Sequence, residues 1–530
     1  MTSTTIARVR LMTGADDRLA AQMRCQSALR PLDLQPPGMP SRAILCIRSM
    51  QDPLPGGLDL RSPHAPRATQ WEMAARNAIR GALSRAVRVA GGFVPLHADA
   101  VLFDDRAELL ACAAQDAAAG ENRWWWRSLV RGMTTDDVRR EWLRQPEYIA
   151  AALDVLDARF DALPFIRALA PHEAIELLVA ALRAHALETF ASEVIRAMTT
   201  PPAAAPDSWG RSTSIPPPPW TRVAPALRDE AALPIEPRLF AGVALALRRA
   251  PARVREARFA REVAAWIVTV RASESAAASP IATAPHVIDE VQPARPPHAE
   301  NAIPPATPHA HSSSAPIDDA APARSGAPIS HESRDEPQRA TSPSPHPDAP
   351  QPAIPAMAPI RSRQESAPLP IPIEGITIDS GYAGVFFLLG AAIALGIYDP
   401  YGRRALAFDV WRFLSLTAHA LLDDIDEDDP LWALFGALAG TEEARKPRRL
   451  RTFLLFTLIF RTRRFVAKAL DAPEPARFLL RRYGRVVVTP AHVDVHFSLA
   501  AHPIEIRLSG LDRDPGWIPA AGRHVAFHFD

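Results

Sequence analysis

The chain contains 530 residues, of which 48% are hydrophobic, and its formal net charge is +1. This length predicts about two to four domains of roughly 100–200 residues each. The balanced charge argues against electrostatic binding of nucleic acid or acidic membrane over the whole surface. The three cysteines, Cys25, Cys46 and Cys112, are odd in number and widely spaced. Such a set indicates a reducing compartment, and neither a disulfide framework nor a zinc site.

The beginning of the chain gives an expectation about location. Residues 1–10 lack a basic region followed by an apolar core. A secretory signal has both of these parts, so we expect none here and a cytoplasmic protein.

The first 200 residues are predicted to form a mixed α/β module that ends in helices. Short apolar runs at 43–48 and 100–103 predict buried strands. A helix is expected over 104–119, with Asp105 as its N-cap because an aspartate side chain can accept a free backbone N–H. Helical spacing of apolar residues continues from Thr135 onward.

Three consecutive tryptophans, Trp124, Trp125 and Trp126, stand between two arginines. Neighbours on a helix lie about 100° apart, so the three rings cannot all face one core. At least one is expected at a surface or a domain interface. The alternatives are an anchor for a protein partner, a contact within this chain, or a stacking platform for single-stranded nucleic acid.

The middle of the chain is predicted to be a linker. No aromatic residue occurs between Trp266 and Tyr382, and residues 272–370 consist largely of Ala, Pro, Ser and His with scattered charges. Such a segment cannot bury enough apolar surface to offset the entropy lost on ordering, so we expect it to be disordered.

The region after the linker contains an uncharged run from Ser380 to Tyr398. Its length approaches the roughly 20 residues that span a bilayer. Four glycines within the run and the lack of a second long apolar segment favour a buried core helix over about 383–395 instead. We therefore do not expect a membrane partner.

Charge is segregated in the next part of the chain. Residues 423–429 are acidic, whereas residues 445–485 are rich in arginine. The basic region is predicted to bind an anionic protein surface, to bind nucleic acid, or to pair with the acidic run. Candidate contact residues here are Arg448, Arg449 and Arg451.

The last residues are predicted to form a small β unit. Residues 485–489, 492–499, 504–508 and 524–529 are short runs in which apolar residues alternate or cluster, as in strands. On such a strand His492, Asp494 and His496 share one face and could ligate Zn²⁺ or Fe²⁺. Residues two apart are separated by about 6–7 Å, so a polar solvent or interface face is preferred. No cofactor, metal or catalytic residue is assigned.

The fold prediction is an α+β protein of several domains. In order, these are a mixed, mainly helical module at 1–200, a Pro-rich break at 201–220, a short helical segment at 221–271, a disordered linker at 272–370, a helical module at 371–484 and a terminal β unit at 485–530.

Several stretches resemble an uncharacterised protein encoded beside extracellular contractile injection systems, which are phage-tail-like particles of bacteria. The C-terminal stretch carries a pattern of the form H-x-D-x-x-F…R-x-x-G-L-D-x-D-P-G-W-x-P-x-x-G-R-x-V-x-F-H-F. Its residues here are His492, Asp494, Phe497, Arg507, Gly510, Leu511, Asp512, Asp514, Pro515, Gly516, Trp517, Pro519, Gly522, Arg523, Val525, Phe527, His528 and Phe529. Looser matches lie at 382–389, 429–434, 43–48, 52–57 and 123–127.

The resemblance implies an assembly context and supplies no catalytic residues. It implies a non-enzymatic structural or assembly accessory protein whose two tethered modules contact subunits of the particle or its assembly machinery. Candidate contacts at this end are Asp512, Asp514 and Trp517. The alternatives are a nucleic-acid-associated protein that uses residues 445–485, and a metal-dependent module at the His-x-Asp-x-His strand.

Overall fold

The computed structural model describes ten segments of the chain. They are residues 41–55, 67–89, 94–128, 134–159, 161–200, 216–224, 233–278, 375–398, 409–440 and 449–530, with single residues between 23 and 40. All of them belong to one compact unit, which joins the chain up to residue 280 with the chain from residue 369 onward. The predicted linker lies outside the described residues, except for its first residues.

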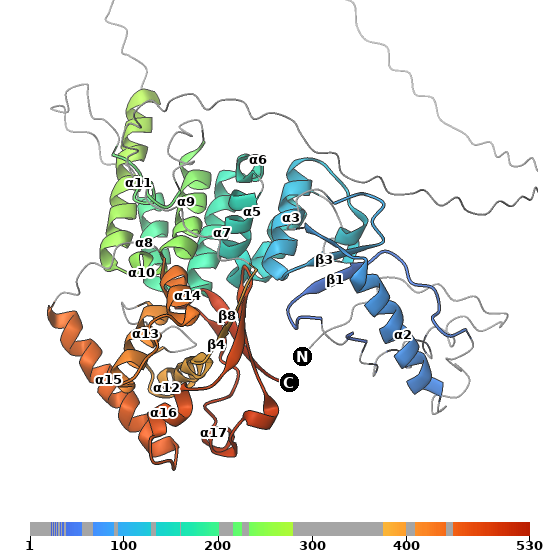
Figure 1. Ribbon diagram of the computed structural model, residues 1–530. Coiled ribbons are helices and arrows are strands. Elements are labelled where there is room, and N and C mark those ends of the chain that lie inside the picture. Colours follow the sequence, from blue (N-terminus) through green and yellow to red (C-terminus); the bar gives the residue numbers. More distant parts are fainter. Residues whose placement is uncertain are drawn as a thin grey trace, which may run out of the picture. The chain divides into compact units, whose positions relative to one another are not determined.

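A small sheet and two helices begin the described part (Figure 1). The sheet has the order β1-β3-β2, with β1 (Ile44–Ile47) antiparallel and β2 (Val87–Arg88) parallel to the central β3 (Ala100–Phe103). Helix α2 (Arg67–Ser84) precedes β2, and α3 (Arg106–Ala118) follows β3. Strands form at both predicted positions, 43–48 and 100–103; β3 is buried as predicted, whereas β1 is half-buried.

The rest of the N-terminal region is helical. Its elements are the 3-10 helices η2 (Trp124–Ser128) and η3 (Pro146–Tyr148) and the helices α4 (Thr135–Arg144), α5 (Ile149–Arg159), α6 (Ala162–Ala168), α7 (Pro171–Ala184), α8 (Glu188–Thr199), α9 (Ile235–Arg249), α10 (Pro251–Val254) and α11 (Ala257–Ala278). Helix α11 continues past residue 272, which corrects the predicted start of the linker.

Local chemistry explains where these helices begin and how they pack. Thr134 and Asp137 form a capping box at the start of α4, in which each side chain satisfies a free backbone N–H. Helix α9 is buried on nearly all sides. Its Gly242 faces the Trp220 ring so closely that an added Cβ would lie 2.1 Å from indole atoms. Only glycine fits there.

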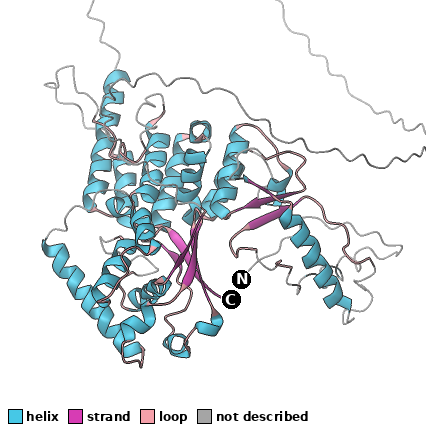
Figure 2. Ribbon diagram, in the orientation of Figure 1, coloured by secondary structure: helices cyan, strands magenta, loops and turns pink. Residues whose placement is uncertain are grey.

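The C-terminal region is built on a five-stranded sheet of order β4-β5-β6-β8-β7 (Figure 2). Its strands are β4 (Ile376–Ser380), β5 (Gly484–Val488), β6 (His492–Phe497), β7 (Gly516–Ile518) and β8 (Arg523–Phe529). Neighbours are antiparallel except for β6 and β8. Three of the four predicted terminal strands are confirmed, and β4 is an addition from the region predicted to be helical.

The fourth predicted strand, at 504–508, is wrong. Residues Ile504–Ser509 form helix α17, which ends at Gly510 in the left-handed conformation. The alternation that predicted a strand does not mark one buried face, because Ile506 is buried whereas Ile504 and Leu508 are 65% and 81% exposed. A single buried residue per turn fits a short surface helix.

Helices lie on one side of the C-terminal sheet (Figure 1). They are the 3-10 helix η5 (Ala383–Phe387), α12 (Leu388–Ala394), α13 (Val410–Leu421), α14 (Pro430–Ala439), α15 (Arg449–Ala469) and α16 (Pro475–Leu480). The core between them and the sheet includes Phe387, whose ring stacks on Phe497 at 4.8 Å.

The uncharged run is buried, as predicted for 383–395, but it forms a 3-10 turn followed by a short α-helix. Its glycines allow close approach of other backbones: a Cβ on Gly384 would lie 2.2 Å from the carbonyl oxygen of Leu479, and one on Gly390 would lie 3.0 Å from that of Leu511. Within the described residues, no helix combines the length and apolarity needed to cross a membrane.

Candidate functional site

One face of the C-terminal sheet is polar and carries the pattern residues His492, Asp494, Trp517 and His528. The opposite face presents Val486, Val488, Val493 and Val495 to the core. The strand register aligns the polar face in rows across the sheet. One row contains Asp379, Arg485, His496 and His528, and another contains His492, His524 and Trp517. The prediction that His492, Asp494 and His496 share a face agrees with this register.

The row that begins with His492 packs against the N-terminal helices, with His492 buried and His524 and Trp517 half-buried. The rings of His492 and His524 stack at 4.9 Å, and Tyr148 from η3 lies 5.8 Å and 5.4 Å from them. Burial lowers the pKa of His492 well below its ordinary value, and it lowers the pKa of His524 to about 4. Both imidazoles are therefore neutral packing groups at neutral pH.

A buried carboxylate fastens the hairpin between β5 and β6 to α3. Asp105 is fully buried and accepts from the backbone N–H of Glu108 at 3.1 Å, as predicted for its N-cap. It also accepts from the Thr489 hydroxyl at 2.7 Å and from the Ala491 N–H at 2.6 Å. Burial raises the pKa of Asp105, while these donors favour its charged form. We call Asp105, Thr489, Ala491, His492, His524 and Tyr148 the joint.

A second set of hydrogen bonds ties the turn before β8 to the N-terminal helices. The Trp517 indole N–H donates to the Ala184 carbonyl at 3.0 Å. The Arg255 guanidinium donates to the carbonyls of Pro519 at 2.5 Å and His185 at 2.9 Å. These bonds satisfy carbonyls at the end of α7 that the helix itself leaves free.

The other C-terminal contact candidates also have partners within the chain. Asp512 accepts from His502 at 3.1 Å, and Asp514 accepts from the Phe527 backbone N–H at 2.6 Å. Each of Asp512, Asp514 and Trp517 thus shapes the fold, and a contact with another protein stays a prediction.

The tryptophan cluster is mostly core. Trp125 and Trp126 are 4% and 1% exposed, and Trp124 is half-buried. The rings meet edge to face at 5.2 Å and 5.7 Å, and the Trp126 N–H donates to Asp116 at 2.8 Å. The burial corrects the prediction of partner contacts for Trp125 and Trp126, because the N-terminal core surrounds both rings. Trp124 alone retains some exposure.

The basic residues predicted to contact a partner lie at, or just before, the start of a described segment, where their side chains are not described. Arg448 lies outside the described residues, and Arg449 and Arg451 belong to α15 with side chains that are not described. Asp424 of the acidic run lies 3.8 Å from Arg477 of α16 and 2.7 Å from Arg481, which follows that helix. Pairing within the chain therefore accounts for part of the predicted charge segregation.

The outer part of the polar face opens onto a cleft of about 1170 Å³. One wall is formed by the C-terminal sheet and the other by the segment before β1 and the small sheet. Polar and charged lining residues include Ser41, Arg42, Arg88, Asp104, Asp379, Arg485, Asp494, His496, His528 and Asp530. Cations and carboxylates alternate around the cleft, so it has no single sign of charge.

The contacts in the cleft do not form a nucleophile relay. His528 Nε2 lies 3.2 Å from the Ser41 hydroxyl and 3.1 Å from the Asp494 carboxylate. In a Ser-His-Asp relay the serine and the carboxylate bind different ring nitrogens, whereas here both use one. His496 pairs instead with Asp530, through Nδ1 at 3.0 Å.

The three side chains of the His-x-Asp-x-His strand each bind a different set of neighbours. His492 stacks in the joint on His524, and Asp494 contacts His528 and lies 3.7 Å from Arg42. In the part of the chain that is described, no three His, Cys, Asp or Glu side chains converge as metal ligands would. The carboxylate between the two histidines is thus engaged by cationic or donor groups.

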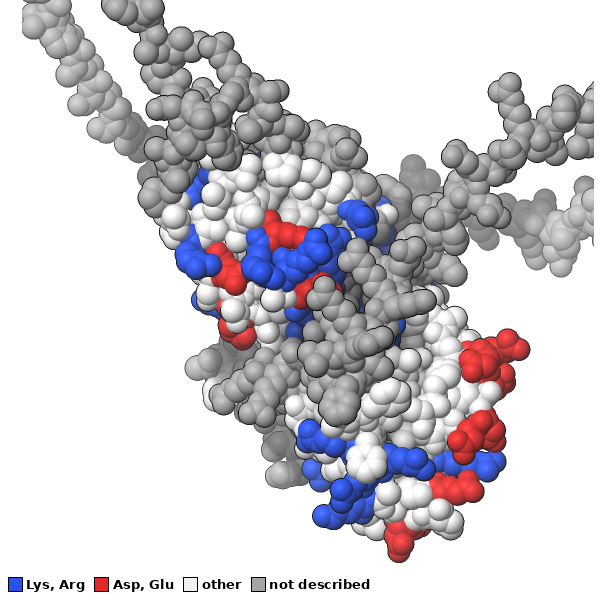
Figure 3. All heavy atoms as spheres, turned by 90° about the vertical axis from the view of Figure 1, so that its left-hand side faces the viewer, with Lys and Arg blue, Asp and Glu red and all other residues white. Residues whose placement is uncertain are grey.

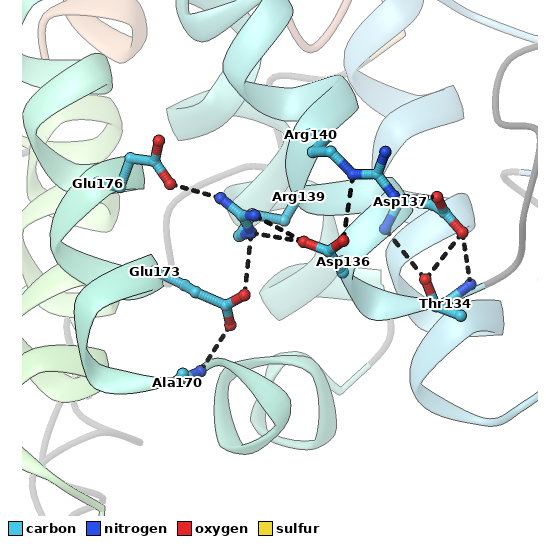
Figure 4. A network of polar contacts seen from close by, with 8 residues as sticks. All are labelled: Thr134, Asp136, Asp137, Arg139, Arg140, Ala170, Glu173 and Glu176. Carbon is cyan, nitrogen blue, oxygen red and sulfur yellow. Dashed lines mark hydrogen bonds and ion pairs between the residues drawn. The ribbon is translucent and has the colours of Figure 1, made fainter.

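A separate charged cluster lies on the N-terminal helices (Figure 4). Arg139 of α4 lies 2.6 Å from Asp136 and 3.1 Å from Glu173 of α7, and it also pairs with Glu176. Every guanidinium in the figure faces a carboxylate. Such surface pairs contribute about 0–1 kcal/mol each, so the cluster is an ordinary contact between two helices.

Sequence reasoning missed the partners that complete these sites, since Asp105, Tyr148 and Arg42 lie hundreds of residues before the strands they contact. The N-cap signal at Asp105 was visible, but its two further hydrogen bonds were not. Comparisons with protein-family models, curated proteins and solved structures found no match to this chain.

Proposed function

We propose that this chain is a non-enzymatic structural or assembly accessory protein of a contractile injection apparatus, and that it acts through protein–protein contacts. The sequence resemblance gives the context. The observation that carries the proposal is that residues of the C-terminal pattern make structural contacts within the chain. Trp517 and Arg523 bind backbone carbonyls, Asp514 binds a backbone N–H, and His492 is a buried packing group.

These are the roles of residues that shape a surface. Catalytic groups instead converge on a point where a reacting atom can sit. The buried joint holds both ends of the chain in a fixed arrangement, which is what a protein needs in order to present several side chains to a partner at once.

The proposal is tested by affinity capture of the tagged full chain from a lysate of the cells that produce it, followed by quantitative mass spectrometry. A tag-only strain is the control. We expect enrichment of sheath, tube, baseplate or assembly-ATPase subunits of a contractile particle. Enrichment of none of these, with nucleic-acid-binding or metabolic proteins in their place, would contradict the proposal.

Nucleic-acid binding by residues 445–485 is the second candidate. It is favoured by the exposed cations Arg461, Arg463, Arg464 and Lys468 on α15. Because phosphate contacts release counterions, such binding must weaken steeply with salt. A gel-shift titration of the full chain with duplex and single-stranded DNA at low salt decides this point: no shift there removes the candidate.

A further inference from the structure

Helix α15 has one face in the core and another in solvent. Leu458, Val466 and the adjoining Leu470 are buried. On the opposite side Phe456 and Phe460 are 66% and 60% exposed. The two rings are spaced i, i+4 and therefore lie side by side, one helical turn apart. Two large aromatic side chains adjacent on one surface are a feature of docking sites for other proteins.

Two cations, Arg463 and Arg464, continue the same stripe toward the end of the helix, whereas Arg461 and Lys468 lie about 100° around it. Arg461, Arg463, Arg464 and Lys468 are all exposed, and no Asp or Glu occurs anywhere in α15. At 100° per residue, Arg463 lies within about 20° of the direction of Phe456, and Arg464 lies within about 40° of that of Phe460. Figure 3 shows Lys and Arg side chains gathered on this part of the molecule.

These cations have little to bind within the described chain. Among the described residues, the single contact of the four is a long one of 3.4 Å, from the Arg461 guanidinium to the Leu395 carbonyl. Asp424 of the acidic run pairs with Arg477 and Arg481 instead. The helix dipole favours cations near a helix C-terminus, but it gives no reason for the exposed phenylalanines that precede them.

We propose that α15 binds an acidic amphipathic helix of a partner protein. This proposal rests on the proposed function and names a surface for its protein–protein contacts. Apolar side chains of that helix cover Phe456 and Phe460, and its carboxylates pair with Arg463 and Arg464. Amphipathic helices present their apolar anchors at i, i+4 spacing, so two helices that pack side by side can pair such anchors. The cations supply charge complementarity, which steers the acidic helix and fixes its register.

The surroundings favour a protein helix over nucleic acid. Acidic side chains lie beside the cations on the face drawn in Figure 3, and Asp424 and Glu474 are among the exposed carboxylates of the neighbouring elements. A phosphate backbone that follows the basic stripe would meet these negative charges. A compact helix can instead end its contact at Arg464.

The test is photo-cross-linking in the producing cells with the full chain. A photoreactive phenylalanine analogue replaces Phe460 in the wild-type background and, separately, in R463E/R464E. A third chain carries the analogue at Leu508, which is 81% exposed on α17 and forms with Ile504 an exposed i, i+4 pair on a helix with one cation, Arg507, and one carboxylate, Glu505. Cross-linked peptides are identified by mass spectrometry, and circular dichroism of the purified chains verifies their folding.

We expect the position-460 analogue to capture a peptide of net negative charge in a helical pattern. Its yield should fall at least tenfold in R463E/R464E, because two attractive contacts become repulsive, and the Leu508 position should not capture that peptide. Capture of nucleic acid, of an uncharged or basic peptide, or of nothing above the Leu508 control would overturn the proposal.

Two outcomes separate this inference from the proposed function. If the captured acidic helix belongs to a protein outside any contractile particle, the docking surface stands and the proposed function fails. If affinity capture recovers particle subunits equally well with wild type and with F456A/F460A, the proposed function stands and the docking surface fails.

Discussion

The joint and the cleft are built on the same two strands, yet they use the same residue type in opposite ways. In the joint, His492 is buried and His524 half-buried, the two rings pack against Tyr148, and burial depresses the pKa of both. In the cleft, His496 and His528 also stack, at 4.6 Å, but each has a carboxylate partner and access to solvent. The difference teaches that the element packed over a strand, and not the strand sequence, decides what its histidines do.

Removing the joint carboxylate should have the largest effect on stability. Asp105→Ala leaves the Thr489 hydroxyl and the Ala491 N–H buried without an acceptor. Each orphaned group costs about 1–3 kcal/mol, so we expect a loss of about 3 kcal/mol in the free energy of unfolding, measured by urea denaturation. The matched cleft variant is Asp530→Ala, whose side chain is 76% exposed. Equal losses in both variants would mean that the joint is not the stronger region.

Lowering the pH should give a second difference in stability between the joint and the cleft. A histidine whose folded pKa lies below its unfolded value disfavours folding once the unfolded chain binds protons, so stability falls as pH drops below about 6.5. For His524, a lowering from 6.5 to about 4 corresponds to at most about 3 kcal/mol, at 1.36 kcal/mol per unit.

Carboxyl groups whose pKa is raised by burial have the opposite effect on the pH dependence of stability. Burial raises the pKa of Glu108 to about 7 and that of Asp409 to about 6, so their contribution is lost as pH rises through the same range. These carboxyl contributions are the same in wild type and in His524→Phe, so they cancel in the difference between the two free energies of unfolding. We expect wild type to lose stability relative to the variant between pH 6.5 and 4, as followed by denaturation at each pH. Parallel profiles would show that His524 is not held neutral by burial.

The turn before β8 should contribute less than the Asp105 contacts. Trp517→Phe keeps an aromatic ring against His524 and His185 but removes the N–H that binds the Ala184 carbonyl. A single net hydrogen bond is worth about 0.5–1.5 kcal/mol, and we expect a loss of about 1 kcal/mol by urea denaturation. A loss above that of Asp105→Ala would reverse the order of the two contacts.

The smallest effect should come from the cleft histidine. His496→Gln removes a partly exposed pair with Asp530, and such surface pairs contribute about 0–1 kcal/mol. We expect the midpoint of thermal unfolding to stay nearly unchanged at neutral pH. A large shift would indicate that the cleft stabilises the fold as the joint does.

The sequence predicted elements whose signal is local. The strands at β5, β6 and β8 follow from short apolar runs, and the α3 N-cap follows from Asp105. The sequence prediction failed where burial depends on tertiary packing. Ile504 and Leu508 alternate with Ile506 but are exposed, whereas Trp125 and Trp126 are buried, with Trp126 against Phe103 and Asp116. The pairing of Asp105 with Thr489 joins residues 384 positions apart, and no local pattern carries that information.

The central claim is that both ends of the chain form one unit through the joint. Co-expression of residues 1–280 and 369–530 as two separate chains, with a tag on the first, tests it most directly. We predict that the two fragments co-purify and elute together in size-exclusion chromatography, and that Asp105→Ala weakens their association. Two fragments that fold independently and elute apart would contradict the account and restore the sequence prediction of two tethered modules.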